Sequence, residues 1–326
     1  MSDRRRYRSV VADSARWDGF QFRPGDIVIS TPPKCGTTWM QRLVSLLVFD
    51  DVELPAPIAK ISPWLDMQLA PLDEVVALLD GQQHRRFIKT HTPLDGVPYD
   101  ERVTYVCVGR DPRDVAVSSA HHMANMDVDR FLQERERAVG LEDLAELGVG
   151  KPGPASPPTP AQQLQTWIDD DSDVTPMSLK FVMTHLTSCW ERRGLSNVAL
   201  FHYQDMLTDL PGQLRRLADT LDIRLSDERI TELADAATFE TMKSQAAHVA
   251  PNADINLWHD TESFFHRGTS GQWQDMFSED DLHAYDRRVA ELASPDLAHW
   301  LHNGWLRLPQ PATSVECDEA SLIPAE

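Results

Sequence analysis

The chain lacks an excess of basic residues. Its 31 lysines and arginines stand against 51 aspartates and glutamates, which gives a formal net charge of −20. Nucleic-acid binding through an overall positive field is therefore disfavoured, because such binding depends on many lysine and arginine contacts to phosphates. A small anion can still bind, but only at a local site built from specific donors.

Cysteines and long apolar runs are also scarce. The four cysteines form no C-x-x-C pair, so a zinc knuckle is disfavoured and a disulfide framework has no support. The longest mainly apolar stretch, Leu43–Phe49, is too short to cross a bilayer, and no apolar signal region follows the basic N-terminal residues. We therefore expect a cytoplasmic protein without a transmembrane segment.

Short β-branched runs alternate with helical patterns along the chain. Strands are predicted over residues 26–30, 86–91, 103–108 and 197–203, and helices over residues 177–193, 208–221, 227–247 and 278–300. This alternation predicts one α/β domain with a central parallel sheet flanked by helices.

Two segments show neither pattern. Residues 148–160 hold five prolines and are predicted to form an irregular loop, and residues 309–326 are predicted to be a disordered tail. The domain is accordingly placed at residues 26–308, after an N-terminal segment of residues 1–25.

The first predicted strand runs into a Pro/Gly turn, Pro32–Trp39, and then into a helix. Such a junction points free N–H groups and the positive end of the helix dipole at one spot. Gly36 permits close backbone approach, Thr37 and Thr38 add hydroxyl donors, and Lys34 adds charge. The turn is predicted to bind a phosphate-like group, although alone it also fits a capped helix with an exposed lysine.

The turn is not a Walker A loop. Thr31 and Thr37 stand where that motif has its first glycine and its lysine. It resembles instead the 5′-phosphosulfate loop of the cytosolic-type sulfotransferases, which use 3′-phosphoadenylyl sulfate (PAPS). Cys35 stands where the family usually has serine. The resemblance implies a P-loop-like turn that binds the cofactor through Lys34, Cys35, Gly36, Thr37, Thr38 and Trp39.

Further segments resemble other motifs of the same family and occur in the same order along the chain, so the resemblance extends over about residues 26–277. They are Lys89–His91, Arg110–Ser118, His202–Met206, Phe239–Lys243 and Phe265–Trp273. The resemblance implies that His91 is the general base on an acceptor hydroxyl, with Lys34 at the bridging oxygen. Histidine suits that task because its unperturbed pKa is about 6.5. Alone, a histidine at a strand end would more simply be a surface residue.

The remaining segments supply the implied nucleotide contacts. Arg110 and Ser118 would hold the 3′-phosphate, and a closing loop would add His266, Arg267 and Gly268. The adenine would contact Tyr203, Phe239 and Met242. His266 stands where the family has an arginine, so phosphate affinity is expected to be weaker and more dependent on pH.

Several segments look like the mycobacterial glycolipid sulfotransferase group in particular, which implies a hydrophobic acceptor such as a glycolipid. The acceptor pocket is expected to come from Met67–Leu79, the helix after Ser118 and the Pro-rich segment. No metal is expected. The rival interpretations are a P-loop kinase and a non-catalytic nucleotide-binding protein. Many family members carry a short KxxxTVxxxE dimer motif. Its four defined positions read Gln274, Ser278, Glu279 and His283 here, so that mode of dimerisation is not implied and the oligomeric state stays open.

Overall fold

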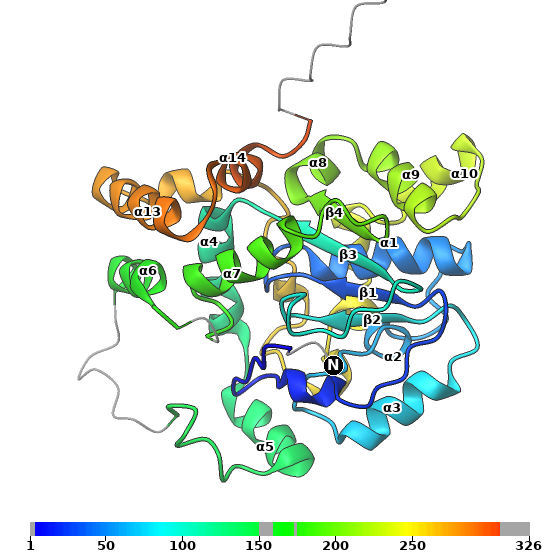
Figure 1. The fold of residues 1–326 in the computed structure, drawn as a ribbon, viewed down its shortest axis with the longest axis horizontal. Helices are drawn as coiled ribbons and strands as arrows, with labels where there is room; N and C mark the ends of the chain where they lie inside the picture. Colours follow the sequence, from blue (N-terminus) through cyan, green and yellow to red (C-terminus); the bar gives the residue numbers. More distant parts are fainter. Residues whose placement is uncertain (1–3, 150–158, 173–174, 307–326) are drawn as a thin grey trace, which may run out of the picture.

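Four parallel strands form the centre of the molecule (Figure 1). The computed structural model describes residues 4–149, 159–172 and 175–306. Within them the strands are β1 (Ile27–Ser30), β2 (Phe87–Thr90), β3 (Thr104–Gly109) and β4 (Val198–His202), in the order β2-β1-β3-β4. Because the chain passes from β2 across β1 to β3, the strand order reverses beside β1. The carboxyl ends of strands at such a point are where ligands bind in open α/β sheets.

Both faces of the sheet are covered by helices, which explains why its strands read as continuous apolar runs. On one face Ile27 and Ile29 of β1 pack with α1 (Thr37–Phe49), α9 (Leu210–Thr220) and α10 (Asp227–Asp235). On the other face, apolar residues of all four strands pack with α3 (Leu72–Gly81), α7 (Leu179–Trp190), α13 (Glu279–Leu292) and α14 (Pro295–Asn303). The predicted α/β class with a parallel sheet is confirmed.

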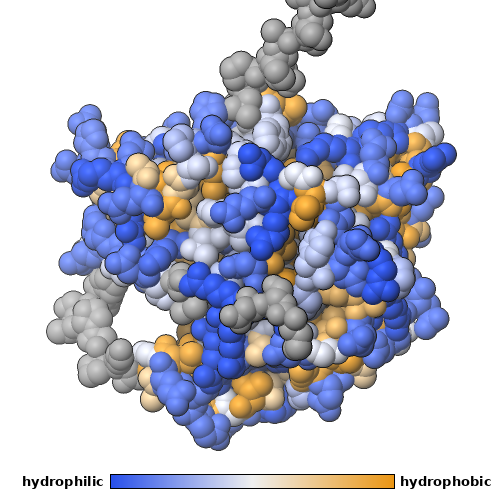
Figure 2. Space-filling view, viewed as in Figure 1, coloured by the Kyte–Doolittle hydropathy of each residue, from blue (hydrophilic) through white to orange (hydrophobic). Residues whose placement is uncertain are grey.

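The remaining helices surround these layers at the sheet's ends and edges. They are α2 (Ile58–Ile61), α4 (Pro112–Asn125), α5 (Val128–Val139), α6 (Pro160–Asp169), α8 (Tyr203–Thr208), α11 (Phe239–Ser244) and α12 (Ala246–Val249). On the face in Figure 2, hydrophobic residues are scattered among predominantly hydrophilic ones. No helix of the described residues is long and apolar enough to traverse a bilayer.

Two predicted helices were wrong in extent. The helix expected over residues 227–247 is broken into α10, α11 and α12. The Trp39 indole N–H donates to the carbonyl of Ala237 at 2.8 Å, and Thr238 caps the next helix by accepting from Thr241 N–H. The carbonyl that would bond residue 241 in a continuous helix is therefore used by a tertiary contact.

The helix expected over residues 278–300 is likewise two helices, α13 and α14. Ser294 caps the second by accepting from Leu297 N–H, and Pro295 occupies its first turn. Proline cannot supply the N–H that a continuous helix would need there. The expected tail and residues 150–158 of the Pro-rich loop lie outside the described residues, and Pro160 at the end of that loop begins α6.

Candidate functional site

The turn after β1 has the backbone shape of an anion-binding loop. Lys34 has φ +67° and Gly36, which precedes α1, has φ +95°. A Cβ on Gly36 would lie 3.0 Å from the Tyr203 ring, so the position is restricted by space as well as by conformation. The first N–H groups of α1 are left for a ligand, because a helix cannot bond them internally.

Two lysines are close together here, the half-buried Lys34 of the turn itself and the buried Lys89 of β2. Lys34 Nζ is 3.1 Å from His122 Nδ1 and 4.9 Å above the centre of the Phe264 ring. Lys89 Nζ lies 4.3 Å above the Trp64 ring. Burial lowers the pKa of each lysine to about 7, and the nearby positive charge of Arg110 contributes at Lys34. Both amines are thus poised to gain charge when an anion arrives.

His91 follows β2 and is held in one tautomer. Its Nδ1 lies 2.7 Å from the carbonyl oxygen of Thr31. A carbonyl only accepts, so Nδ1 carries the hydrogen and Nε2 keeps a free lone pair. Burial, with help from the charge of Lys89, holds the pKa of His91 well below its usual range. The imidazole is therefore neutral at pH 7 and can accept a proton.

A buried carboxylate fixes the segments on either side of His91. Trp64 packs edge-on against the His91 ring, with centroids 4.5 Å apart. The Asp66 carboxylate accepts hydrogen bonds from four side chains, those of Trp17, Trp64, Thr90 and Thr92. Because Thr90 and Thr92 flank His91, Asp66 ties the strand end to the tryptophan that packs on it.

Arg110 lies at the end of β3 and joins the turn to the loop before α13. Its guanidinium donates to the carbonyls of Lys34 and Thr269, each at 3.0 Å, and lies 4.2 Å over the Tyr203 ring. Its Nε–H is buried and has no hydrogen-bond partner within residues 4–149, 159–172 and 175–306. An unpaired buried donor of a charged group is costly, which favours an anionic ligand at this point.

The loop over residues 265–272 is anchored on α4. The Asp114 carboxylate accepts from the backbone N–H groups of Gly271 at 2.8 Å and Gln272 at 2.9 Å. Gly268 has φ +64°, and a Cβ there would lie 2.2 Å from the Phe239 ring. Only glycine lets this loop lie so close to Phe239.

Two histidines stack where this loop meets α4. The rings of His121 and His266 are 3.6 Å apart with an interplanar angle of 25°. His266 Nε2 is buried and has no hydrogen-bond partner in the part of the chain that the structure describes. Burial lowers the pKa of His266, and the charges of His121 and Arg267 add to the shift. The ring is thus predominantly neutral at pH 7 and has an unused nitrogen.

One cavity of about 700 Å³ collects these residues. Every catalytic or nucleotide-binding residue predicted from the sequence lines it except Cys35, which is buried behind the turn. The part of the cavity formed by the predicted nucleotide-binding residues is called the loop end. It comprises Lys34, Gly36, Thr37, Thr38, Trp39, Arg110, Ser118, Tyr203, Phe239, Met242, His266, Arg267 and Gly268. Among the described residues that line the cavity there is no aspartate or glutamate, although the chain has 51. Its positive charges thus face the interior without a lining carboxylate.

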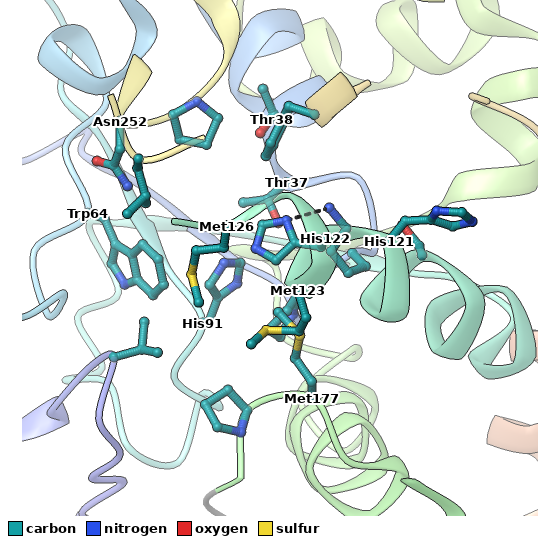
Figure 3. Close-up of a pocket in the computed structure, with 18 of the residues that line it drawn as sticks. Thr37, Thr38, Trp64, His91, His121, His122, Met123, Met126, Met177 and Asn252 are labelled. Atoms are coloured by element: carbon teal, nitrogen blue, oxygen red, sulfur yellow. Dashed lines mark hydrogen bonds between the residues drawn. The ribbon is translucent and has the colours of Figure 1, made fainter. Parts of the chain in front are cut away.

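The rest of the cavity is mostly apolar, although polar residues such as Arg8, Ser9, Thr175 and Asn252 also line it. We call it the methionine end; its lining includes Val10, Val11, Met67, Met123, Met126, Phe131, Leu132, Met177, Phe181 and Leu257. In Figure 3, His91 and His122 lie between Thr37 and Thr38 on one side and Met177 on the other. The two histidines therefore stand at the junction of the two ends.

The origin of the methionine end was predicted only in part. Met67, the helix with Ser118 and Val149 of the Pro-rich segment do contribute, as expected, but residues 68–79 do not line the cavity. Residues 150–158 of the Pro-rich segment lie outside the described residues. The N-terminal segment contributes Tyr7–Ala12, which no sequence pattern suggested.

His121 and His122 were also missed, although a signal existed. They lie three and four residues after Ser118 on α4, and residues at that spacing share a helix face. Lys89 was noted only as part of its motif. Across the described residues, no three His, Cys, Asp or Glu side chains gather as a metal ion would need.

Comparisons with known proteins agree on one family. The family model for the sulfotransferase domain matches residues 24–295. A glycolipid sulfotransferase of Mycobacterium bovis (strain BCG / Pasteur 1173P2) is 48% identical over 320 residues, covering 93% of this chain and 96% of the relative. Sulfotransferase 1B1 of Mus musculus is 26% identical over 294 residues, covering 86% and 87%.

Solved structures share the fold. Retinol dehydratase, crystallised with retinol and PAP, superposes with a TM-score of 0.66 at 24% identity, covering 86% of this chain and 85% of that one. A mouse sulfotransferase complexed with PAP superposes with a TM-score of 0.65 at 22% identity, covering 88% of this chain and 91% of that one. At these identities the likeness concerns the arrangement of helices and strands.

Proposed function

The chain belongs to the sulfotransferase family, and from this premise we propose that it transfers the sulfuryl group of PAPS to a hydroxyl of a glycolipid-type acceptor. The single observation that carries the proposal is the one cavity, whose basic loop end and apolar methionine end meet at His91. The donor is supported by the PAP bound in the related structures, and the acceptor by the names of the 47–48% identical relatives.

The loop end would hold the nucleotide. The N–H groups at the start of α1, with Thr37 and Thr38, would bind the 5′-phosphate side. Arg110, Ser118 and the 266–268 loop would bind the 3′-phosphate, with Trp39, Tyr203, Phe239 and Met242 around the adenine. The unpaired Nε of Arg110 and Nε2 of His266 support this placement, because each lacks a hydrogen-bond partner among the described residues.

The reaction needs a base and a cation, and the junction supplies both. Nε2 of His91 takes the proton of the acceptor hydroxyl as its oxygen bonds to sulfur. The bond from sulfur to the bridging oxygen breaks, and the Lys34 ammonium stabilises the charge left on PAP. Positioning and electrostatic stabilisation carry the rate, as in phosphoryl transfer.

The methionine end would bind the acceptor's apolar part. Its methionines are flexible and fill irregular space, which suits chains that lack a rigid shape. Met123 and Val128, exposed by 48% and 50%, lie where this end opens to solvent. We further propose that the protein acts in the cytoplasm, needs no metal and does not bind nucleic acid.

Transfer of radiolabel from [³⁵S]PAPS tests the function. Purified protein with EDTA is expected to label a lipid from a total lipid extract more efficiently than simple phenols, and His91→Ala serves as the inactive control. Tight PAP binding with no labelled product would indicate a non-catalytic nucleotide-binding protein. Binding that requires Mg²⁺ and ATP would indicate a kinase.

A further inference from the structure

Lys34 has an unusual hydrogen-bond partner. Nζ lies 3.1 Å from Nδ1 of His122, the dashed line in Figure 3, and this is its only hydrogen bond to the described residues. His122 comes from α4, on the helix face that also carries Ser118. The contact thus links the turn after β1 to a helix that lines both ends of the cavity.

The charges around Lys34 and His122 determine which of the two donates the hydrogen bond. Arg110 and Lys89 raise the cost of a charged Lys34, and the buried Cys35 thiol stays neutral because burial raises its pKa to about 12. Burial, with Lys34, Lys89 and His91 nearby, holds the pKa of His122 well below its usual range. His122 is therefore neutral and can accept the ammonium's hydrogen at Nδ1.

Resting on the proposed function, we propose that His122 is a positioning residue, which holds the Lys34 ammonium at the junction of the two ends until the phosphosulfate group binds. A neutral partner suits this task. A carboxylate would cancel the charge that the phosphosulfate needs, whereas imidazole leaves it intact. Release of the lysine then breaks one hydrogen bond and no ion pair.

The His122 ring is itself held in place. It packs against Trp258 and Phe264 at centroid distances of 4.8 and 6.0 Å, and Phe264 also lies under Lys34 Nζ. A purely structural role for His122 would therefore rest on aromatic packing, and a positioning role would rest on Nδ1. The two roles call for different replacements.

Two substitutions separate these roles. His122→Asn keeps an acceptor oxygen near the position of Nδ1 but removes the ring. His122→Phe keeps an aromatic ring but removes the acceptor. With a positioning role, kcat/KM for PAPS stays within about threefold in the asparagine variant and falls on the order of tenfold in the phenylalanine variant. His248→Phe, at an exposed site away from the cavity, is the matched control.

A readout without turnover accompanies the kinetics. The chain has six lysines, so the ¹³Cε signal of Lys34 can be assigned with Lys34→Met and titrated in the nucleotide-free protein. Its pKa of about 7 is expected to persist in His122→Asn. In His122→Phe it is expected to fall by about one unit, because the bond that favours the charged form is lost.

The opposite pattern, with activity and titration kept in His122→Phe and lost in His122→Asn, would show a packing role and overturn the proposal. Losses in both variants as large as that of His91→Ala would overturn it too, since His122 would then handle the proton itself. A wild type with no PAPS turnover would refute the proposed function, and the lysine titration alone would then decide on His122.

Discussion

The two ends of the cavity are built in different ways. The loop end is formed by backbone turns and by side chains from short segments, many of which lie where a strand ends or a helix begins, together with Ser118 inside α4 and the 266–268 loop. The methionine end is assembled from apolar side chains of residues 10–11, 67, 123–132, 177–181 and 257. The loop end presents fixed hydrogen-bond donors and positive charge, whereas the methionine end presents an apolar wall with few directional contacts.

This difference assigns different tasks to the two ends. Fixed donors select one geometry and one charge, so substitutions in the loop end should change nucleotide affinity steeply. An apolar wall stabilises a ligand roughly in proportion to buried area, so substitutions in the methionine end should have graded effects. His91, at the junction, should affect turnover without belonging to either binding task.

The largest effect is expected at that junction. His91→Ala should lower kcat by about 10²–10⁴-fold, because the proton of the acceptor then has no positioned base. PAP affinity should stay close to that of wild type, since His91 faces the acceptor. Steady-state kinetics with titration calorimetry measure both; turnover near that of wild type would make His91 structural.

A glycine pair tests whether the loop end depends on close contact. Gly268→Ala would place a Cβ 2.2 Å from the Phe239 ring, whereas Gly271→Ala meets nothing closer than 3.9 Å. Both glycines have positive φ, so their backbone strain is similar. We expect PAP affinity to fall on the order of tenfold more in Gly268→Ala than in Gly271→Ala. Equal losses of PAP affinity in the two variants, measured by titration calorimetry, would mean that backbone strain and not the contact with Phe239 determines the effect.

The pH dependence of PAP binding examines His266. A phosphate beside its ring would raise the pKa that burial has lowered. Affinity should therefore be greatest below the free-protein pKa and fall as pH rises through the raised pKa of the complex. His266→Arg should flatten this contribution and tighten binding at pH 8. Lys34 titrates in both proteins, so the comparison of their pH 6 to pH 8 ratios isolates His266; identical ratios would place it away from the phosphate.

The smallest effect is expected in the methionine end. Met126→Gln should lower kcat/KM for a lipid acceptor by about five- to tenfold, because a polar group replaces part of an apolar wall. Its PAP affinity should not change. Met276→Gln, at an exposed site outside the cavity, is the control. A change in PAP affinity without a change in acceptor kinetics would contradict the division into two ends.

The same division explains what could be predicted from the sequence. The strands and the turn after β1 are local features, because a strand–turn–helix junction occupies consecutive positions. The other residues of the loop end were predicted from short segments that resemble motifs of the sulfotransferase family. The methionine end depends on which distant segments the fold brings together. The N-terminal residues Tyr7–Ala12 approach it through a chain path that no periodicity encodes.

The errors in helix extent had two different physical causes. The break at Thr238 depends on the Trp39 indole, nearly 200 residues earlier in the sequence, which binds the carbonyl of Ala237. The break at Ser294 and Pro295 is local, since a capping serine followed by proline marks a new helix start. The break at Thr238 could be recognised only from the tertiary structure, whereas the signal for the break at Ser294 and Pro295 was present in the sequence.

The most direct test of the central claim is calorimetric titration of PAP and of AMP, without metal, into the wild-type protein. If the turn after β1, Arg110, Ser118 and the 266–268 loop form one nucleotide site, PAP should bind at least on the order of 100-fold more tightly than AMP, because only PAP carries the 3′-phosphate. Equal affinities for PAP and AMP, or binding of PAP only with Mg²⁺, would contradict it.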